Sequence, residues 1–450
     1  MIVEARAREA WRWTCTDAAA TWAFRAALVL TVPVMYIVGR NQWFIRDDWA
    51  FVLTRNEIRT EVGWQEWLFL PTIGHWMTVP LLVYRVLQSA FGLDSYWPYL
   101  VVNMAIHVGV VLAVREICRR AGARAWTTTL VCGGLLVFGP GWENIVFAVQ
   151  ITYGLSMLGF LCQVLLADHD GPPDWRDAVG SLLAVIGVMS SGFGPFFALG
   201  IAVLLVLRRR WLALAIAVAP QAIALGWWWL AWGRDSPEES TSGGAGLVPG
   251  YAMRGIVAVF DGLIGFPGLG LLVAIATFAL ALWRGHGWPR QSLLLALWAT
   301  AAVMYLGLGT QRGAFGVENA AISRYQYMGA VLLAPAFALL IDQLRRIAPE
   351  AAWAGRVMIA LAIVLNAAAL RTNSSAWAAR SGDERRILEL VAGSGLAPEA
   401  DPERQPLEFS PDVRVRDIDM LVEDGAISPR APATPEELAL VRAVLGLPAV

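Results

Sequence analysis

The stretch WAFRAALVLTVPVMYIVGRNQWFIRDDW, residues 22–49, joins a long apolar run to two adjacent carboxylates. Residues 22–39 are close to the roughly 20 apolar residues that a membrane-spanning helix needs. No small-residue cleavage site follows this run, so we expect a membrane anchor and not a cleaved signal. The acidic pair, Asp47 and Asp48, then lies just beyond the first span in an aromatic, apolar sequence.

The composition indicates a membrane protein. Of the 450 residues, 57% are hydrophobic and only 16% are charged, with a mean hydropathy of +0.54. A soluble chain of this length carries more charge. The formal net charge of -1 provides no basic field for nucleic acid, so we expect no nucleic-acid partner. The four cysteines have no metal-ligand spacing, and buried thiols are the simplest interpretation of Cys118, Cys132 and Cys162, which lie in or beside apolar runs.

Apolar runs recur along most of the chain and predict an all-α polytopic membrane protein with about 11 transmembrane helices. The expected spans are 22–39, 97–117, 126–140, 146–167, 177–191, 193–207, 211–230, 265–283, 291–308, 327–343 and 355–371. Segments rich in arginine fall on one side of these spans, together with the N-terminus: 115–124, 208–210, 283–290 and 345–356. The positive-inside rule makes that side the cytoplasm.

The expected spans divide the chain into three parts. Residues 1–21 form a cytoplasmic N-terminus, residues 22–372 a transmembrane domain, and residues 373–450 an outer C-terminal domain. An odd number of spans places the C-terminus outside, in a multi-pass protein of the plasma (inner) membrane. Residues 40–96 form the first outer loop.

Two capping-box patterns predict helix starts within the C-terminal domain. Ser381 is followed by Glu384, and Thr434 is followed by Pro435 and Glu437. In this motif the hydroxyl of the first residue accepts a hydrogen bond from the backbone of the third helical residue.

The first outer loop is rich in aromatic residues of the kind that favour the membrane–water interface. They are Trp43, Trp49, Trp64, Trp67, Trp76, Tyr84, Tyr96 and Trp97. Residues 75–92 have apolar positions at helical spacing, which predicts a helix lying in the interface. Such a segment can hold a lipid-linked molecule with its headgroup beside Asp47 and Asp48.

Two adjacent carboxylates at this depth suit proton transfer. If they face a cavity, Asp47 and Asp48 can deprotonate an acceptor hydroxyl or bind a divalent cation. Their mutual repulsion raises one pKa, which suits a base that works near neutral pH. The alternative is that the pair only marks the water interface, with Arg46 screening its charge.

Further polar side chains near the outer ends of the spans are candidate substrate-binding residues. Glu143 and Gln150 lie seven residues apart, on one helix face if a helix begins that early, and suit sugar hydroxyls. Arg324 suits a lipid phosphate because a guanidinium offers paired donors. The complete set of candidates is Arg46, His75, Arg85, Glu143, Asn144, Gln150, Arg324, Tyr325 and Tyr327, with Arg254 and Arg312 as weaker ones.

Structural explanations compete with these assignments. Glu143 suits the start of a helix, where the helix dipole favours an acid. Arg324 with its tyrosines suits an interfacial anchor. His75 either orients the acid, contacts a phosphate or only forms a structural hydrogen bond, whereas His107 lies within a span and is expected to face the bundle. No His-x-x-x-His spacing supports a histidine-rich metal site.

The order of motifs in the first quarter of the chain resembles that of the GT-C glycosyltransferases, which use polyprenyl-phosphate-linked sugars. The group includes protein O-mannosyltransferase-like and aminoarabinose-transferase-like enzymes. An acidic pair after the first span is followed by GHW, then by YR, FGL and Y, then by a span with Asn and His. The matching residues are Asp47, Asp48, Gly74, His75, Trp76, Tyr84, Arg85, Phe91, Gly92, Leu93, Tyr96, Asn103 and His107.

The resemblance implies a catalytic base in the acidic pair: Asp47, with Asp48 as alternate or helper. It also implies a polyprenyl-phosphate sugar donor, an acceptor hydroxyl on a glycan, lipid or protein at the outer face, and inversion if displacement is direct. The family often has Asp-Glu where this chain has Asp-Asp. A lipid-glycan transporter or flippase, and a non-catalytic envelope-assembly protein, are the alternatives.

Overall fold

A computed structural model describes residues 16–72, 74–234, 245–283, 285, 287–347 and 351–448. Residues 1–15 of the expected N-terminal segment, and most of the polar loop after residue 233, lie outside these ranges. Within the described residues the chain is helical, and the one β contact is an isolated bridge between Thr72 and His75.

Seven described helical segments are long and apolar enough to cross a membrane, so the protein is a multi-pass membrane protein. They are built on α2 (Asp17–Gly39), α7 (Trp97–Ala121), α10 (Ile151–Ala167), α13 (Trp211–Trp228), α16 (Trp288–Arg312), α17 (Ser323–Ile347) and α18 (Ala351–Ser394). Shorter helices complete the bundle: α8 (Ala125–Leu136), α11 (Trp175–Val188), α12 (Gly194–Leu207), α14 (Val248–Ile264) and α15 (Gly270–Leu282).

Each expected span coincides with one of these helices, but α14 was not expected. Its sequence contains Arg254 and Asp261, and these charges interrupt the apolar run that a hydropathy reading requires. Both charges are satisfied locally. Arg254 pairs with Glu318 at 2.8 Å, and Asp261 accepts hydrogen bonds from the backbone N–H groups of Gly268 and Gly270.

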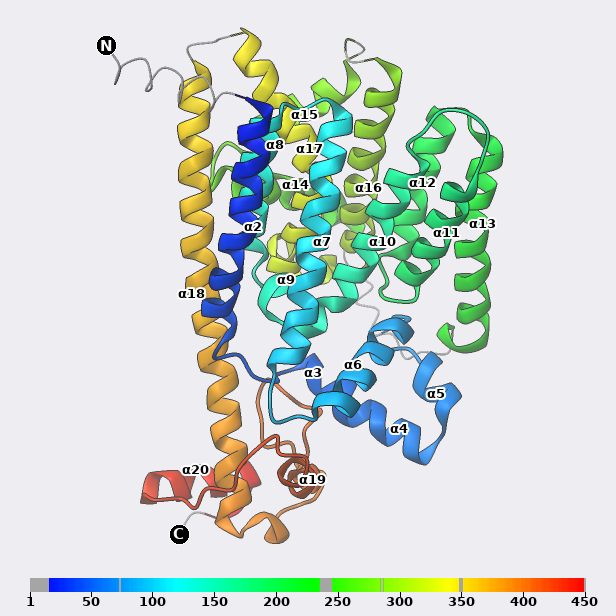
Figure 1. Cartoon of the computed structure of the whole chain (residues 1–450). Helices are drawn as coiled ribbons and strands as arrows, with labels where there is room; N and C mark the ends of the chain where they lie inside the picture. The colour runs from blue at the N-terminus through cyan, green and yellow to red at the C-terminus, as the bar shows by residue number, and fades with distance from the viewer. Residues whose placement is uncertain are drawn as a thin grey trace, which may run out of the picture.

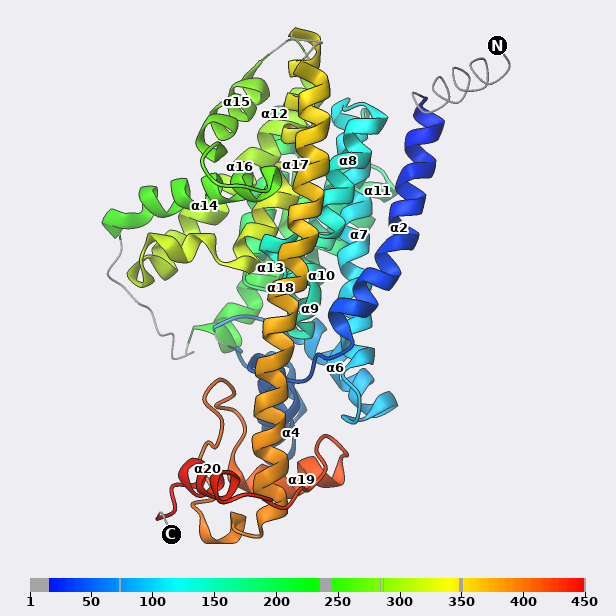
Figure 2. The same cartoon turned by 90° about the vertical axis from the view of Figure 1, so that its left-hand side faces the viewer.

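The helices stand side by side with two distinct ends (Figures 1 and 2). One end carries the start of α2, the arginine-rich ends of α7 and α17, and the arginine-rich turn after α12. Two ion pairs join the turn after α12 to its neighbours: Arg208 pairs with Asp168, just after α10, at 2.5 Å, and Arg210 pairs with Asp177 in α11 at 3.2 Å.

The other end carries the helices of residues 40–96, the loop that the sequence predicts to be the first outer loop, and of the C-terminal segment (Figure 1). The loop contains α3 (Asp47–Trp49), η1 (Ala50–Thr54), α4 (Arg55–Glu61), α5 (Trp64–Phe69) and α6 (Thr78–Phe91), and the C-terminal segment contains α19 (Ile418–Glu423) and α20 (Pro435–Leu445). The helix expected over residues 75–92 is therefore present as α6. Short helices also precede α10 and α17: η2 (Gly139–Gly141), α9 (Glu143–Val146), η3 (Ala148–Gln150), η7 (Gly313–Phe315) and η8 (Val317–Ala321).

Helix α18 links the two ends of the molecule (Figure 2). It continues without interruption past residue 373, where the sequence predicts a domain boundary. The helix start expected at Ser381 is wrong, because Ser381 lies inside α18 and its hydroxyl donates to the carbonyl of Ala378 at 3.1 Å. The start at Thr434 is confirmed, since its hydroxyl accepts the N–H of Glu437 at 3.2 Å.

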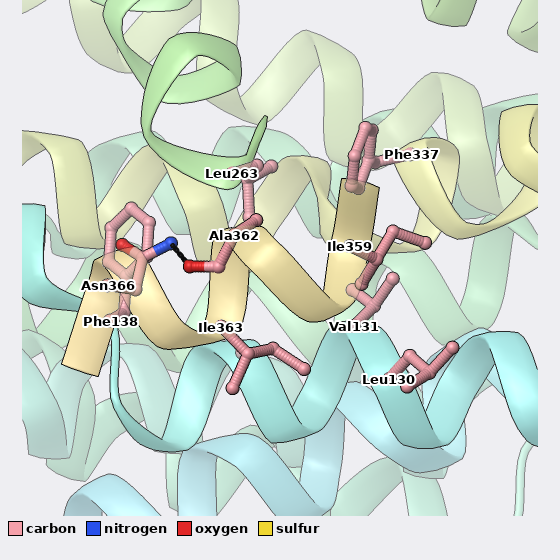
Figure 3. Close-up of a pocket in the computed structure, with 10 residues that line it drawn as sticks. Leu130, Val131, Phe138, Leu263, Phe337, Ile359, Ala362, Ile363 and Asn366 are labelled. Carbon is pink, nitrogen blue, oxygen red and sulfur yellow. Dashed lines mark hydrogen bonds between the residues drawn. The ribbon is translucent and has the colours of Figure 1, made fainter. Parts of the chain in front are cut away.

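Close backbone contact fixes α18 against the rest of the bundle. A Cβ added to Gly139 would lie 2.4 Å from the carbonyl oxygen of Asn366, so only glycine fits there. The Asn366 amide donates to the carbonyls of Ala362 and Gly262, which joins α18 to α14. A crevice of about 10 Å³ beside these residues is lined by apolar side chains such as Leu263 and Phe337 (Figure 3). It is too small for any ligand larger than water.

Candidate active site

A strained turn carries the acidic pair. Arg46 has φ 55° and ψ -125°, and among the described residues only Arg209 is another non-glycine residue with positive φ. Such a conformation persists only where surrounding contacts hold it. The N–H of Arg46 donates to the hydroxyl of Ser410 at 2.7 Å, and that hydroxyl donates to Glu384 at 2.6 Å. Two residues of the C-terminal segment therefore hold the turn before Asp47.

Asp48 is directed into the protein and is fully buried. Its carboxylate accepts hydrogen bonds from the hydroxyls of Tyr84 at 2.5 Å and Tyr96 at 2.9 Å, and from the N–H of Ile45 at 3.2 Å. Burial raises the pKa of Asp48 to about 7, even though these hydrogen bonds favour the charged form. Tyr96 in turn accepts the N–H of Ala148 at 2.8 Å, so the buried acid joins the loop to the start of α10.

Asp47 lies on the opposite side of the turn and lines a cavity of about 300 Å³. The first outer loop, the start of α10 and the segment between α16 and α17 all contribute to its wall. The lining residues are Arg46, Asp47, Phe51, Thr72, His75, Met77, Val149, Gln150, Thr152, Tyr153, Arg312, Phe315, Asn319, Ile322, Arg324 and Tyr325. The turn thus separates the acidic pair, with Asp47 facing the cavity and Asp48 held among tyrosines.

Three arginines face this cavity together with Asp47. They are Arg46, Arg312 and Arg324, and within the part of the chain that the structure describes none of their guanidinium groups donates a hydrogen bond. Arg324 approaches Glu143 with 3.3 Å between Nε and Oε2, but the angle is unsuitable for a hydrogen bond. The ion pair therefore locates Arg324 while its donors remain available to an anion.

Two further residues add polar groups to the wall. Gln150 is only 1% exposed, and its Oε1 has no hydrogen-bond partner among the described residues. A buried amide oxygen without a partner is costly, so it marks a place for a ligand or a water molecule. His75 has a lowered pKa because of its burial and the charge of Arg312, and it is therefore neutral at pH 7.

The structure brings together Asp47, Arg46, His75, Gln150, Arg324 and Tyr325 from the residues that the sequence singles out, but it places others elsewhere. Tyr327 lies inside the bundle, with its hydroxyl 2.8 Å from Nδ1 of His107. Asn144 is buried, and neither polar atom of its side chain has a described partner. Arg85 lines a different pocket, between α4, α6 and α19. Glu143 does not line the cavity but pairs with Arg324, which does.

The sequence analysis did not identify several residues that line the cavity or support the turn at Arg46. Tyr153 and Asn319 are in the wall, and Arg312 ranked only as a weaker candidate. Ser410 lies 364 residues from its partner Arg46, so no local pattern could reveal that contact. Asp412 accepts the Thr54 hydroxyl at 2.8 Å, and its pKa is raised by burial and, to a smaller extent, by the charge of Asp47.

The acidic pair does not suit a shared divalent cation, because the oxygens of Asp48 are already engaged by Tyr84, Tyr96 and a backbone N–H. Within the described ranges, one other cluster has metal-ligand composition: His169, Asp174 and Asp177. It lies at the arginine-rich end of the bundle. The guanidinium of Arg210 lies 3.2 Å from Asp177 and 3.1 Å from His169 Nε2, and this cation already supplies the balancing charge. These residues do not fit a resident metal ion.

The helix arrangement is similar to that of two proteins of solved structure. No family model and no curated protein sequence matches the chain. Its fold is similar to that of ArnT from Cupriavidus metallidurans, solved with bound undecaprenyl phosphate, with a TM-score of 0.52 and 13% identity over 95% of this chain and 88% of that one. It is also similar to an oligosaccharyltransferase from Archaeoglobus fulgidus, solved with zinc and sulfate, with a TM-score of 0.50 and 13% identity over 94% of this chain and 61% of that one.

Proposed function

We propose that the protein is a membrane glycosyltransferase that moves a sugar from a polyprenyl-phosphate donor to an acceptor hydroxyl. The observation that carries the proposal is the shared cavity of Asp47 and three arginines whose guanidinium groups donate no hydrogen bond to the described residues, in a GT-C fold. An anion with several oxygens suits three guanidinium forks, and a phosphate has such oxygens. The ArnT structure of the same fold holds a polyprenyl phosphate, which supports this class of donor.

In the proposed reaction, Asp47 is the general base. The acceptor oxygen attacks the anomeric carbon while Asp47 takes its proton, and the bond from that carbon to the phosphate oxygen breaks. The leaving polyprenyl phosphate keeps the bonding electrons, and Arg324 and Arg312 stabilise its charge. A direct displacement inverts the anomeric configuration. Gln150 and Tyr325 provide polar contacts for the sugar.

The proposed orientation follows from the arginine-rich end of the bundle. With that end in the cytoplasm, the N-terminus is inside, and the cavity and the C-terminal segment from residue 373 face the outer side of the plasma membrane. The donor's lipid tail would then lie along the bundle, with its phosphate at headgroup depth. Cysteine-accessibility labelling of Ser240→Cys and Arg346→Cys in intact cells tests the orientation: label at residue 240 alone supports it, and label at residue 346 alone rejects it.

Transfer from a radiolabelled polyprenyl-phosphate sugar, measured in membranes that contain the chain, tests the activity. Asp47→Asn should lower the rate by roughly 10²–10⁴-fold, the usual contribution of a general base. Asp412→Asn is the matched control, since Asp412 is a nearby carboxylate that does not line the cavity. Full transfer by Asp47→Asn rejects the proposed base. Lipid movement across the membrane without transfer indicates a flippase.

A further inference from the structure

A second polar pocket lies on the same end of the molecule as the Asp47 cavity but is formed by different residues. It has a volume of about 390 Å³ and lies between α4, α6 and α19, helices that Figure 1 shows together beyond the end of the bundle. Its lining residues are Asn56, Arg59, Arg85, Gln88, Ser89, Gly92, Leu93, Met420 and Asp424.

Two arginines in this pocket have no acidic partner. In the described part of the chain, neither Arg59 nor Arg85 lies within 4.0 Å of a carboxylate oxygen, and Nε of Arg59 is buried without a hydrogen-bond partner. The guanidinium carbon of Arg59 lies 5.3 Å from the centroid of the Trp64 ring. This cation–π contact holds the Arg59 side chain in place. An arginine with a buried, unused donor beside a second free arginine favours an anionic ligand.

The remaining polar groups are arranged around the arginines. Arg85, Gln88 and Ser89 lie on one face of α6, at positions i, i+3 and i+4. Asn56 donates its amide to Oε1 of Gln88 at 3.2 Å, and the amide nitrogen of Gln88 has no described partner. Asp424 is exposed at the rim and suits a hydroxyl donor. Two cations, an amide donor and one carboxylate fit a phosphate that is attached to a hydroxylated group.

Apolar side chains flank this pocket on α6. Leu82, Val86 and Phe91 are 44%, 65% and 57% exposed. Leu82 and Val86 lie on the helix face adjacent to Arg85 and Ser89. A polar pocket next to exposed apolar residues suits a molecule with a charged headgroup and an acyl chain.

We propose that this outer pocket binds a phosphate group attached to a polyol, supplied either by a lipid headgroup or by a water-soluble polyol phosphate. The site is separate from the Asp47 cavity, because the two have no lining residue in common. The inference does not depend on the proposed transferase activity.

Binding to the full chain in detergent tests the proposal with two probes, sn-glycerol 3-phosphate by calorimetry and phosphatidylglycerol by native mass spectrometry. Arg85→Gln should weaken binding of at least one probe by roughly tenfold, the loss expected for a charge-assisted hydrogen bond. A loss with phosphatidylglycerol alone identifies the lipid source, and a loss with glycerol 3-phosphate alone identifies the soluble source. Arg85 makes no described hydrogen bond, so its substitution leaves the fold intact.

Two controls separate the outer pocket from other basic surfaces. Arg404→Gln removes one exposed positive charge of the C-terminal segment away from the pocket and should change neither affinity. Arg312→Gln alters only the Asp47 cavity. Unchanged binding of both probes by Arg85→Gln and by Arg59→Gln overturns the proposal, as does a loss confined to Arg312→Gln. Because no sugar transfer is measured, failure of the transferase assay leaves this result unaffected.

Discussion

Tyr84 donates its hydroxyl to Oδ1 of Asp48 at 2.5 Å, and this contact distinguishes two carboxylates that are adjacent in the chain. It holds Asp48 against α6, and the turn at Arg46 leaves Asp47 facing the arginine-lined cavity. The neighbouring acids therefore have different environments, and we assign them different roles. Asp47 is the proposed base, and Asp48 is a positioning residue that attaches the loop to α6 and, through Tyr96, to η3.

The buried acid predicts a pH-dependent stability. The pKa of Asp48 is about 7 in the folded protein and 3.8 in the reference state, so between these values the folded state retains a proton that the unfolded state has lost. The stabilising contribution is complete below pH 4, falls as the pH rises from about 4 to about 7, and does not change further above that. Thermal unfolding at pH 5 and pH 8 measures the slope of stability against pH. Asp48→Asn should flatten it, whereas an identical slope in both proteins contradicts the assignment.

The hydrogen bond between the Arg46 N–H and the Ser410 hydroxyl predicts that substitutions at these two residues have non-additive effects on stability. Ser410→Ala leaves the N–H of Arg46 and Oε2 of Glu384 without their hydrogen bonds, and should destabilise the protein by about 1–3 kcal/mol. It should also lower the transfer rate while leaving the KM for the donor unchanged, since Ser410 does not line the cavity.

Arg46→Gly tests the strain itself. Glycine adopts this backbone conformation without steric cost, so the loss from Ser410→Ala should be smaller in the Arg46→Gly background. Ser381→Ala is the matched serine control, because that hydroxyl only bonds a carbonyl of its own helix. Strictly additive free energies of unfolding would show that Ser410 does not support the turn.

Arg324 should determine donor affinity more than stability. Arg324→Gln removes a guanidinium proposed to bind the phosphate, and we expect the KM for the polyprenyl-phosphate sugar to rise roughly tenfold or more. Arg254→Gln provides the comparison, since Arg254 pairs with the exposed Glu318 outside the cavity. Steady-state kinetics in membranes measure both variants. Equal KM values for the two variants would remove Arg324 from the donor site.

Helix packing gives a prediction that is independent of function. Gly139→Ala places a Cβ against the backbone of α18 and should cost about 1–3 kcal/mol, the usual penalty for overpacking. Gly133→Ala, where a Cβ meets nothing within 4 Å, should be neutral or slightly stabilising because alanine favours the helix. Thermal unfolding in detergent compares them, and an unchanged midpoint for Gly139→Ala would contradict the close approach of α18.

The sequence by itself located the long apolar helices, because apolar length is a local property that one stretch of chain carries alone. It also located the interfacial helix α6 and the acidic pair at the end of α2. It missed α14, because Arg254 and Asp261 interrupt its apolar run and the partner of Arg254, Glu318, lies 64 residues away in the sequence.

Only the tertiary structure decided which aspartate faces the cavity, that Arg85 belongs to another pocket, and that Ser410 holds the turn at Arg46. The sequence treats Asp47 and Asp48 as equivalent neighbours. Their difference arises from a backbone angle and from hydroxyl groups 36 and 48 residues away, which only folding brings within hydrogen-bond distance.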